Sequence, residues 1–175
     1  VGIPHCPHCG RKLESQSAEA ISRQLQELKP GNRMMILAPF VSGKKGEHRD
    51  VLNSIRNEGF VRARIDGNIV LLDEEELPAL EKTRRHTIEA VVDRLVTGQT
   101  DASRLTDSVE LALRHGGGTL TVLLEAPEGT EPEFREESFS ENLACTECGV
   151  SYGELLPRNF SFNSPQGACP KCNGL

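Results

Sequence analysis

The chain has 175 residues, of which 37% are apolar and 26% charged, and its formal net charge is -6. This charge argues against a protein that coats nucleic acid over its whole surface, and no stretch approaches the roughly 18 uninterrupted apolar residues of a membrane helix. The length suffices for one ordinary domain and a small metal-stapled unit. Because aromatic residues make up only 4%, the core must rest on Val, Ile and Leu.

The first half of the chain alternates between helical and strand patterns. Apolar residues at helical spacing predict a helix over 15–28, and a dense apolar run predicts a buried strand over 34–41. A second helix is expected over 47–58, followed by a glycine at its C-terminal end. Residues 60–66 alternate, and Gly-Asn then turns the chain into 69–72, which predicts a β-hairpin.

The second half continues this mixture. The acidic run 73–76 indicates a solvated connection. Residues 86–96 fit either period, and their β-branched content favours a strand. A third helix is expected over 101–115, before three consecutive glycines, and a strand over 119–124.

These elements predict an α+β fold with several segments. Residues 1–14 form an N-terminal flank, and 15–125 form a mixed α/β module. The Pro-, Gly- and Glu-rich stretch 126–137 is expected to be a linker to a zinc-binding segment, 138–175.

All six cysteines fall in C-x-x-C pairs, a pattern typical of metal or redox sites rather than of a disulfide framework. Since no charged and then apolar leader opens the chain, we expect a cytoplasmic protein. The first residue is Val1 rather than Met, and the last pair lies close to the C-terminus. We therefore expect a piece excised from a longer protein.

The two C-terminal pairs are spaced like a structural zinc site. Cys145 and Cys148 are followed after twenty residues by Cys169 and Cys172. Tetrahedral Zn²⁺ binds four thiolates, and a two-residue spacer lets each pair turn back on one ion. Two disulfides, or four unrelated buried thiols, are the alternative. Without zinc, residues 138–175 are expected to unfold.

The N-terminal pair, Cys6 and Cys9, has no obvious partner pair left in the chain. Its other two ligands could come from residues outside the chain, or it could be a redox dithiol, although no βαβ context surrounds it. It could also use a histidine of this sequence (His5, His8, His48 or His86).

No catalytic constellation is recognisable in the sequence. The run Ser-Gly-Lys-Lys-Gly at 42–46 lacks the spacing of a phosphate loop, and its Lys44 and Lys45 could instead contact a nucleic-acid backbone. His48, His86 and His115 are isolated imidazoles, which are more often structural than catalytic. We therefore expect no enzymatic activity from this chain.

Arg62 and Arg64 lie two residues apart on one predicted strand, and Arg94 lies on a second that could be its neighbour. Arginine suits interfaces because its planar fork binds carboxylates in a bidentate manner, so an acidic protein partner is one interpretation. The alternative is a solvated polar face whose arginines pair with Asp66 and Asp93.

Longer motifs are found at residues 1–10 (VGIPHCPHCG), 43–48 (GKKGEH), 59–67 (GFVRARIDG) and 160–170 (FSFNSPQGACP). Together they resemble the UvrA family, the damage-sensing ATPase subunit of the bacterial UvrABC excinuclease. The resemblance covers essentially the whole chain. It implies an internal piece of the first ABC-type half, with neither nucleotide motif present, so that ATP would bind only elsewhere in the parent protein.

By this resemblance, residues 15–125 form an inserted docking domain for UvrB, flanked by parts of a zinc-stapled signature domain. Arg62 and Arg94 would meet acidic residues of UvrB, with Arg64 as a neighbour. Zn²⁺ would be structural at Cys145, Cys148, Cys169 and Cys172, and a later C-x-x-C of the parent protein would complete a site with Cys6 and Cys9.

The parent protein of such a piece would be a homodimer that acts on damaged double-stranded DNA in nucleotide excision repair. A zinc module that contacts DNA directly is the alternative to protein docking. Such a module would use a set of basic residues spread along the chain (Lys44, Lys45, Arg135, Arg158 and Lys171).

Overall fold

The computed structural model describes residues 3–13, 15–72, 77–125, 134–145, 148 and 151–152. The chain divides into two compact units. The larger unit is Gln16–Glu141, and the smaller one combines Val1–Ser15 with Asn142–Leu175. None of the helices in the described part of the chain is both long and apolar enough to span a bilayer.

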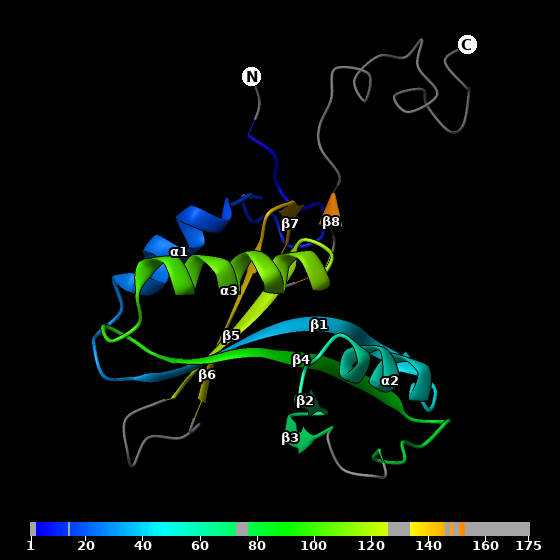
Figure 1. Cartoon of the computed structure of the whole chain (residues 1–175). Helices are drawn as coiled ribbons and strands as arrows, with labels where there is room; N and C mark the ends of the chain where they lie inside the picture. The colour runs from blue at the N-terminus through cyan, green and yellow to red at the C-terminus, as the bar shows by residue number, and fades with distance from the viewer. Residues whose placement is uncertain are drawn as a thin grey trace, which may run out of the picture. The chain divides into compact units, whose positions relative to one another are not determined.

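The larger unit is built on a six-stranded antiparallel sheet with the strand order β3-β2-β4-β1-β5-β6 (Figure 1). Its strands are β1 (Arg33–Lys45), β2 (Arg62–Ile65), β3 (Asn68–Leu71), β4 (Arg85–Val96), β5 (Thr119–Glu125) and β6 (Phe134–Ser140). Its helices are α1 (Ala18–Gln26), α2 (Arg49–Asn57) and α3 (Ala102–His115).

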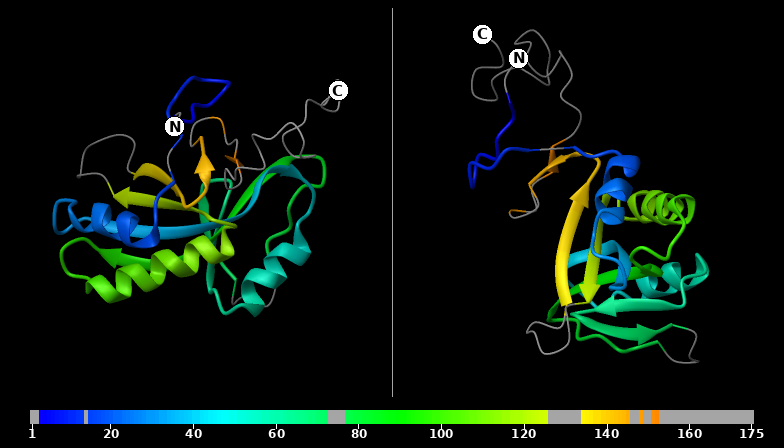
Figure 2. Two further views of the ribbon diagram at one scale, coloured as in Figure 1. Left: turned by 90° about the horizontal axis from the view of Figure 1, so that it is seen from above. Right: turned by 90° about the vertical axis from the view of Figure 1, so that its left-hand side faces the viewer.

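The three helices cover one face of the sheet, as the side view in Figure 2 shows. Helices α1 and α3 pack over β1 and β5, where Ile21 and Leu25 join a cluster with Ile36 and Val122. Helix α2 packs over β2 and β4 through a second cluster (Leu52, Ile55, Ala63, Ile88 and Ala90). Since all the helices that the structure describes lie on this side, the opposite face of the sheet has no helical layer within the described residues.

The expected α+β fold is confirmed, and each helix and strand expected between residues 15 and 125 is present. β1 runs further than predicted, to Lys45, because its end still pairs with the start of β4. The hairpin turn is Asp66-Gly67 rather than the predicted Gly67-Asn68. Both turn residues have positive φ, 49° and 89°, as a type I′ turn requires.

The predicted linker 126–137 is too long, because its last four residues belong to β6. This strand pairs with β5 along its whole length, from Glu125 opposite Phe134 to Thr119 opposite Ser140. Residues 138–140, which were predicted to begin the zinc-binding segment, therefore complete the sheet instead.

The sheet is strongly bent. Neighbouring strands are about 4.8 Å apart, so β2 and β6, which are four steps apart, would be about 19 Å apart in a flat sheet. Nevertheless Arg64 Nη1 on β2 lies 2.9 Å from Glu136 Oε2 on β6. Three register shifts in the pairing of β1 with β4 provide the bend, because β-bulges increase strand twist and curvature. The uncovered face is therefore concave.

His86 ties the start of β4 to the hairpin turn. Its Nδ1 lies 2.7 Å from Asp66 Oδ2, and its Nε2 lies 2.9 Å from the Glu81 carbonyl oxygen. Both ring nitrogens thus face acceptors, which only the imidazolium satisfies with two N–H donors. The hydrogen bonds that His86 donates to the Asp66 carboxylate and to the Glu81 carbonyl raise the pKa of His86, against the opposing effect of burial. The nearby Arg84 opposes the shift, and the His48 ring packs edge-on at 6.2 Å.

This pair predicts a loss of stability in alkaline solution. A raised folded-state pKa means that the contribution of His86 is complete below its ordinary pKa of about 6.5 and is lost as the pH rises through the folded-state value. The free energy of unfolding, measured by denaturant titration at about pH 6 and about pH 9, should fall more steeply for the unchanged chain than for His86→Gln. Equal slopes in the two proteins would contradict the assignment.

The smaller unit has little regular structure among its described residues. A two-residue strand, β7 (Leu143–Ala144), pairs with β8 (Ser151–Tyr152), and His5 forms an isolated bridge with Lys12. Among the residues that the structure describes there, the buried apolar cluster consists of Cys6, Leu13 and Cys145. So small a cluster points to another source of stability.

Candidate functional site

Four cysteines of the smaller unit converge on one point. Cys6, Cys9, Cys145 and Cys148 have all four Sγ atoms within 4.8 Å of one another, and the Cys9 and Cys145 sulfurs are 3.4 Å apart. Cys6 and Cys145 are buried, while Cys9 and Cys148 are exposed. None of the four forms a disulfide.

Local backbone geometry shapes each C-x-x-C pair into a knuckle. The Gly10 N–H donates to the Cys6 carbonyl at 2.8 Å, and the Cys6 N–H donates to the Arg11 carbonyl at 2.7 Å. Gly10 has a φ of 73°, which glycine adopts without steric cost. In the second pair, the Cys148 N–H donates to the Cys145 sulfur at 3.5 Å. Such N–H···S contacts are the usual support of a ligating thiolate.

This donor set fits a tetrahedral metal ion. A Zn–S distance of about 2.3 Å places the four sulfurs of a zinc site about 3.8 Å apart, which matches the spacing of these thiols. The hydrogen bond with Cys9, followed by burial and the other two thiols, raises the pKa of Cys148 to about 12. Four thiolates so close together need a compensating cation, which a divalent metal supplies.

The pairing of the cysteines differs from the prediction. The spacing grouped Cys145 and Cys148 with Cys169 and Cys172, and left Cys6 and Cys9 to partners outside the chain. The structure instead brings Cys6 and Cys9 together with Cys145 and Cys148. The two cysteines whose sulfurs are in contact, Cys9 and Cys145, are 136 residues apart in the sequence. Cys169 and Cys172 lie outside the described residues.

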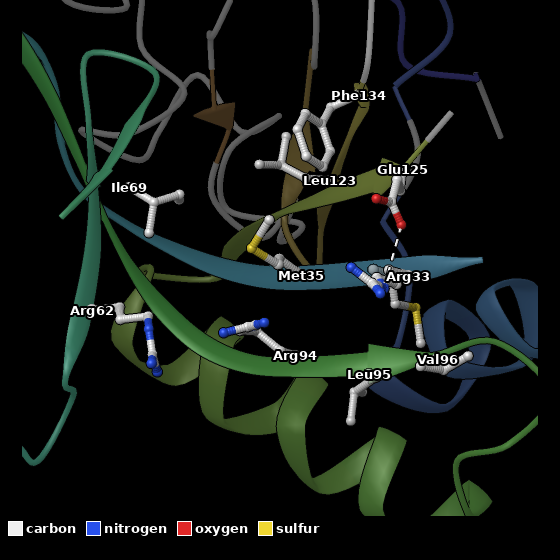
Figure 3. Close-up of a pocket in the computed structure, with 11 residues that line it drawn as sticks. Arg33, Met35, Arg62, Ile69, Arg94, Leu95, Val96, Leu123, Glu125 and Phe134 are labelled. Carbon is white, nitrogen blue, oxygen red and sulfur yellow. Dashed lines mark ion pairs between the residues drawn. The ribbon is translucent and has the colours of Figure 1, made fainter. Parts of the chain in front are cut away.

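The concave face of the larger unit holds a hollow of about 410 Å³ (Figure 3). Strands from both ends of the sheet contribute to it, including β3, β2, β4, β1, β5 and β6. Apolar side chains form much of its lining (Met35, Ile69, Leu95, Leu123 and Phe134). Ile69 and Phe134 are 42% and 39% exposed, unusually open for large apolar residues. We call this surface the arginine hollow.

Arg62 and Arg94 both line the arginine hollow, and Figure 3 shows their guanidinium groups on the same side of it. Arg62 comes from β2, and Arg94 comes from the part of β4 that pairs with Met35. Within the described ranges, no carboxylate forms an ion pair with either guanidinium. Two positive charges therefore stand beside an apolar surface.

The two aspartates considered as partners for these arginines are engaged elsewhere. Asp66 accepts from the Thr87 N–H and pairs with His86. Asp93 pairs with Arg104 at 3.0 Å on the helical side of the sheet. Burial alone would raise the pKa of Asp93, but its hydrogen bonds with Arg104 and Ser108 lower it. Asp66 and Asp93 are therefore not the ion-pair partners that the alternative, a solvated polar face, requires.

Arg64 does not belong with the two open arginines. Its side chain is only 12% exposed, and its Nε donates to Glu89, whose side chain is 4% exposed. Its Nη1 donates to Glu136 at 2.9 Å. With its Nε and Nη1 engaged in these ion pairs, Arg64 differs from Arg62 and Arg94, and a direct contact between Arg64 and a partner stays a prediction.

Sequence reasoning missed Glu89 and Glu136. Glu89 lies within the β-branched run of β4, and a carboxylate among residues that are otherwise buried is a recognisable sign of an internal ion pair. Burial raises the pKa of Glu89, while the charge of Arg64 and hydrogen bonds with Arg64 and Thr121 lower it. Glu136 gave no sign, because β6 itself was not predicted.

The other candidate residues are dispersed. Lys44 and Lys45 are exposed at the end of β1, opposite His86 and Arg85 of β4. Arg135 pairs with Glu137 on its own strand. The His48 Nε2–H donates to the Lys44 carbonyl, and His115 pairs with Glu58, which supports structural roles for both. Arg158 and Lys171 lie outside the described residues.

Comparison with known proteins gives consistent matches. A family profile described as "UvrA interaction domain" matches residues 16–126. The whole chain is 47% identical to UvrABC system protein A of Clostridium perfringens, 45% to that of Deinococcus radiodurans and 46% to that of Bacillus subtilis. The chain spans 18%, 17% and 17% of the length of these relatives.

Proposed function

Because the chain belongs to the UvrA family, with its larger unit matching the UvrA interaction domain, we propose that this unit docks UvrB through the arginine hollow. The resemblance seen in the sequence motifs is thereby confirmed. The observation that carries the docking proposal is the pair of guanidiniums, Arg62 and Arg94, which have no carboxylate partner among the described residues and lie beside an open apolar surface.

The chemistry of the hollow suits a protein partner that presents carboxylates around an apolar side chain. Interface centres combine large apolar contacts with arginine, which is less strongly hydrated than lysine and forms bidentate pairs with carboxylates. Charge complementarity of this kind raises the association rate and selects the partner. On this view Ile69 and Phe134 provide apolar contact, and Arg62 and Arg94 provide orientation.

Calorimetric titration of UvrB into the 175-residue chain tests the docking proposal. One-to-one binding that weakens as salt increases is expected, because part of the attraction is electrostatic. Absence of heat and of complex formation at any salt concentration would refute the proposal for this chain.

We further propose that the smaller unit is a structural zinc module held by Cys6, Cys9, Cys145 and Cys148. The convergence of the four sulfurs and the small size of the unit's apolar cluster support this. Zinc would link the two C-x-x-C knuckles and stabilise a unit whose described residues form only a small apolar cluster. It would have no catalytic role there, since all four ligand positions are filled by thiolates.

Direct DNA contact is a second candidate function, favoured by the basic end of the β1–β4 ribbon. Lys44, Lys45 and Arg85 are exposed there on paired strands. If phosphates are contacted, the logarithm of the binding constant should fall linearly with the logarithm of the salt concentration, with a slope of about -0.9 per contact for duplex DNA. Binding to a DNA duplex that disappears in Lys44→Gln/Lys45→Gln would support this function independently of UvrB.

A further inference from the structure

Arg64, Glu89 and Glu136 form an ionic bridge across the concave face of the sheet. The Arg64 side chain on β2 contacts Glu89 on β4 and Glu136 on β6. Glu89 also hydrogen-bonds with Thr121 of β5. The three ionic side chains thus join β2, next to one edge of the sheet, to β6 at the other edge, without using the backbone hydrogen bonds between neighbouring strands.

This bridge lies beside the two arginines of the docking surface. Arg62 is two residues before Arg64 on β2, so the two side chains lie on the same face of that strand. Arg94 lies on β4, the strand of Glu89. Phe134 and Glu136 are likewise two residues apart on β6. Any change in the bend of the sheet would therefore move the guanidiniums and the apolar lining of the hollow relative to one another.

We propose that Arg64 and Glu136 are positioning residues, which hold the sheet at the curvature that sets the spacing of Arg62 and Arg94 for the partner. This inference rests on the docking function. The planar geometry of arginine matters, because one guanidinium donates from Nε to one carboxylate and from Nη1 to another, on strands that are not neighbours. A lysine in place of Arg64 could not make both contacts in the same fixed geometry.

The test uses Glu136→Gln rather than a change of Arg64. Removal of Arg64 would leave the buried carboxylate of Glu89 uncompensated and could unfold the chain. Glu136 is 52% exposed, so its neutralisation leaves the Arg64–Glu89 pair in place. The matched control is Glu125→Gln, since Glu125 also lines the hollow but pairs with Arg33 at 3.7 Å, away from the bridge.

The sign of the change in UvrB affinity separates the two roles that Glu136 could have. If Glu136 were only a negative charge near an acidic partner, its neutralisation would strengthen binding, as is expected for Glu125→Gln. If it positions Arg64, Glu136→Gln should weaken binding about three- to tenfold. Unchanged or tighter binding in Glu136→Gln would overturn the proposal.

A distance measurement makes the result independent of the docking function. Spin labels carried by p-acetylphenylalanine at Asn68 on β3 and Arg135 on β6 report the separation of the two ends of the sheet and avoid the cysteines. Glu136→Gln should lengthen or broaden this distance, while Glu125→Gln should leave it unchanged. If the distance in Glu136→Gln equals that in the original chain, the bridge does not hold the sheet, whether or not UvrB binds. Failure of UvrB to bind the original chain would refute only the docking function.

Discussion

Reversal of either charge in the arginine hollow is expected to weaken UvrB binding about 100-fold or more, since loss of one partner in a desolvated charge pair costs about 2–5 kcal/mol and reversal adds repulsion. The variants are Arg62→Glu and Arg94→Glu. Both side chains lack a carboxylate partner within the described part of the chain, so neither change breaks an ion pair that the fold needs there. Calorimetry with purified UvrB measures the loss, and circular dichroism confirms folding.

Arg49→Glu is the matched control for this prediction. It makes the same change of charge at an exposed position in the first turn of α2, on the helical side of the sheet. A carboxylate is favourable near a helix N-terminus, so the control should remain folded. Equal losses in Arg49→Glu and Arg94→Glu would show a general charge effect and would contradict a specific role for the hollow.

Loss of one cysteine of the cluster is expected to remove the metal and unfold the smaller unit, with the sheet of the larger unit intact. Structural zinc provides an apparent binding free energy on the order of 10–16 kcal/mol, far more than a cluster of Cys6, Leu13 and Cys145 can replace. The measurement is zinc per chain, by release to a chromogenic chelator. Amide NMR signals show which unit has lost its structure.

Two serine variants distinguish the possible ligand sets. Cys6→Ser should lose zinc if Cys6 and Cys9 share the ion with Cys145 and Cys148, as their converging sulfurs suggest. If Cys145 and Cys148 instead share the ion with Cys169 and Cys172, as the sequence spacing predicted, Cys169→Ser should lose the zinc. Zinc at Cys145 that survives Cys6→Ser would contradict the ligand set proposed here.

The sequence predicted the elements whose pattern is local. Helices α1, α2 and α3 and strands β1 to β5 carry apolar residues at the period of their own secondary structure, because each has one face in the core. β6 was missed because its residues Phe134–Ser140 are acidic and mostly exposed, as befits a strand at the edge of a sheet. Nothing in its own pattern shows that it pairs with β5.

The candidate sites depended on contacts between distant residues, which a single sequence does not reveal. Arg62 and Arg94 could be named from residue type, strand position and family resemblance. The different role of Arg64 could not be predicted, because its partner Glu136 is 72 residues away in the sequence and is brought close only by the bend of the sheet. The proximity of Cys9 and Cys145, which are 136 residues apart, could not be predicted either, because the spacing of the two C-terminal pairs already fitted a zinc site.

The two methionines of the chain offer the most direct test of the docking surface. Both line the arginine hollow, but Met35 is half-buried, whereas Met34 is 2% exposed and packs in the cluster beneath the helices. With ¹³C-labelled methionine methyl groups, the spectrum contains one signal from each. Addition of UvrB should shift the Met35 signal more than that of the buried Met34. A complex in which Met35 keeps its shift would contradict docking at the arginine hollow.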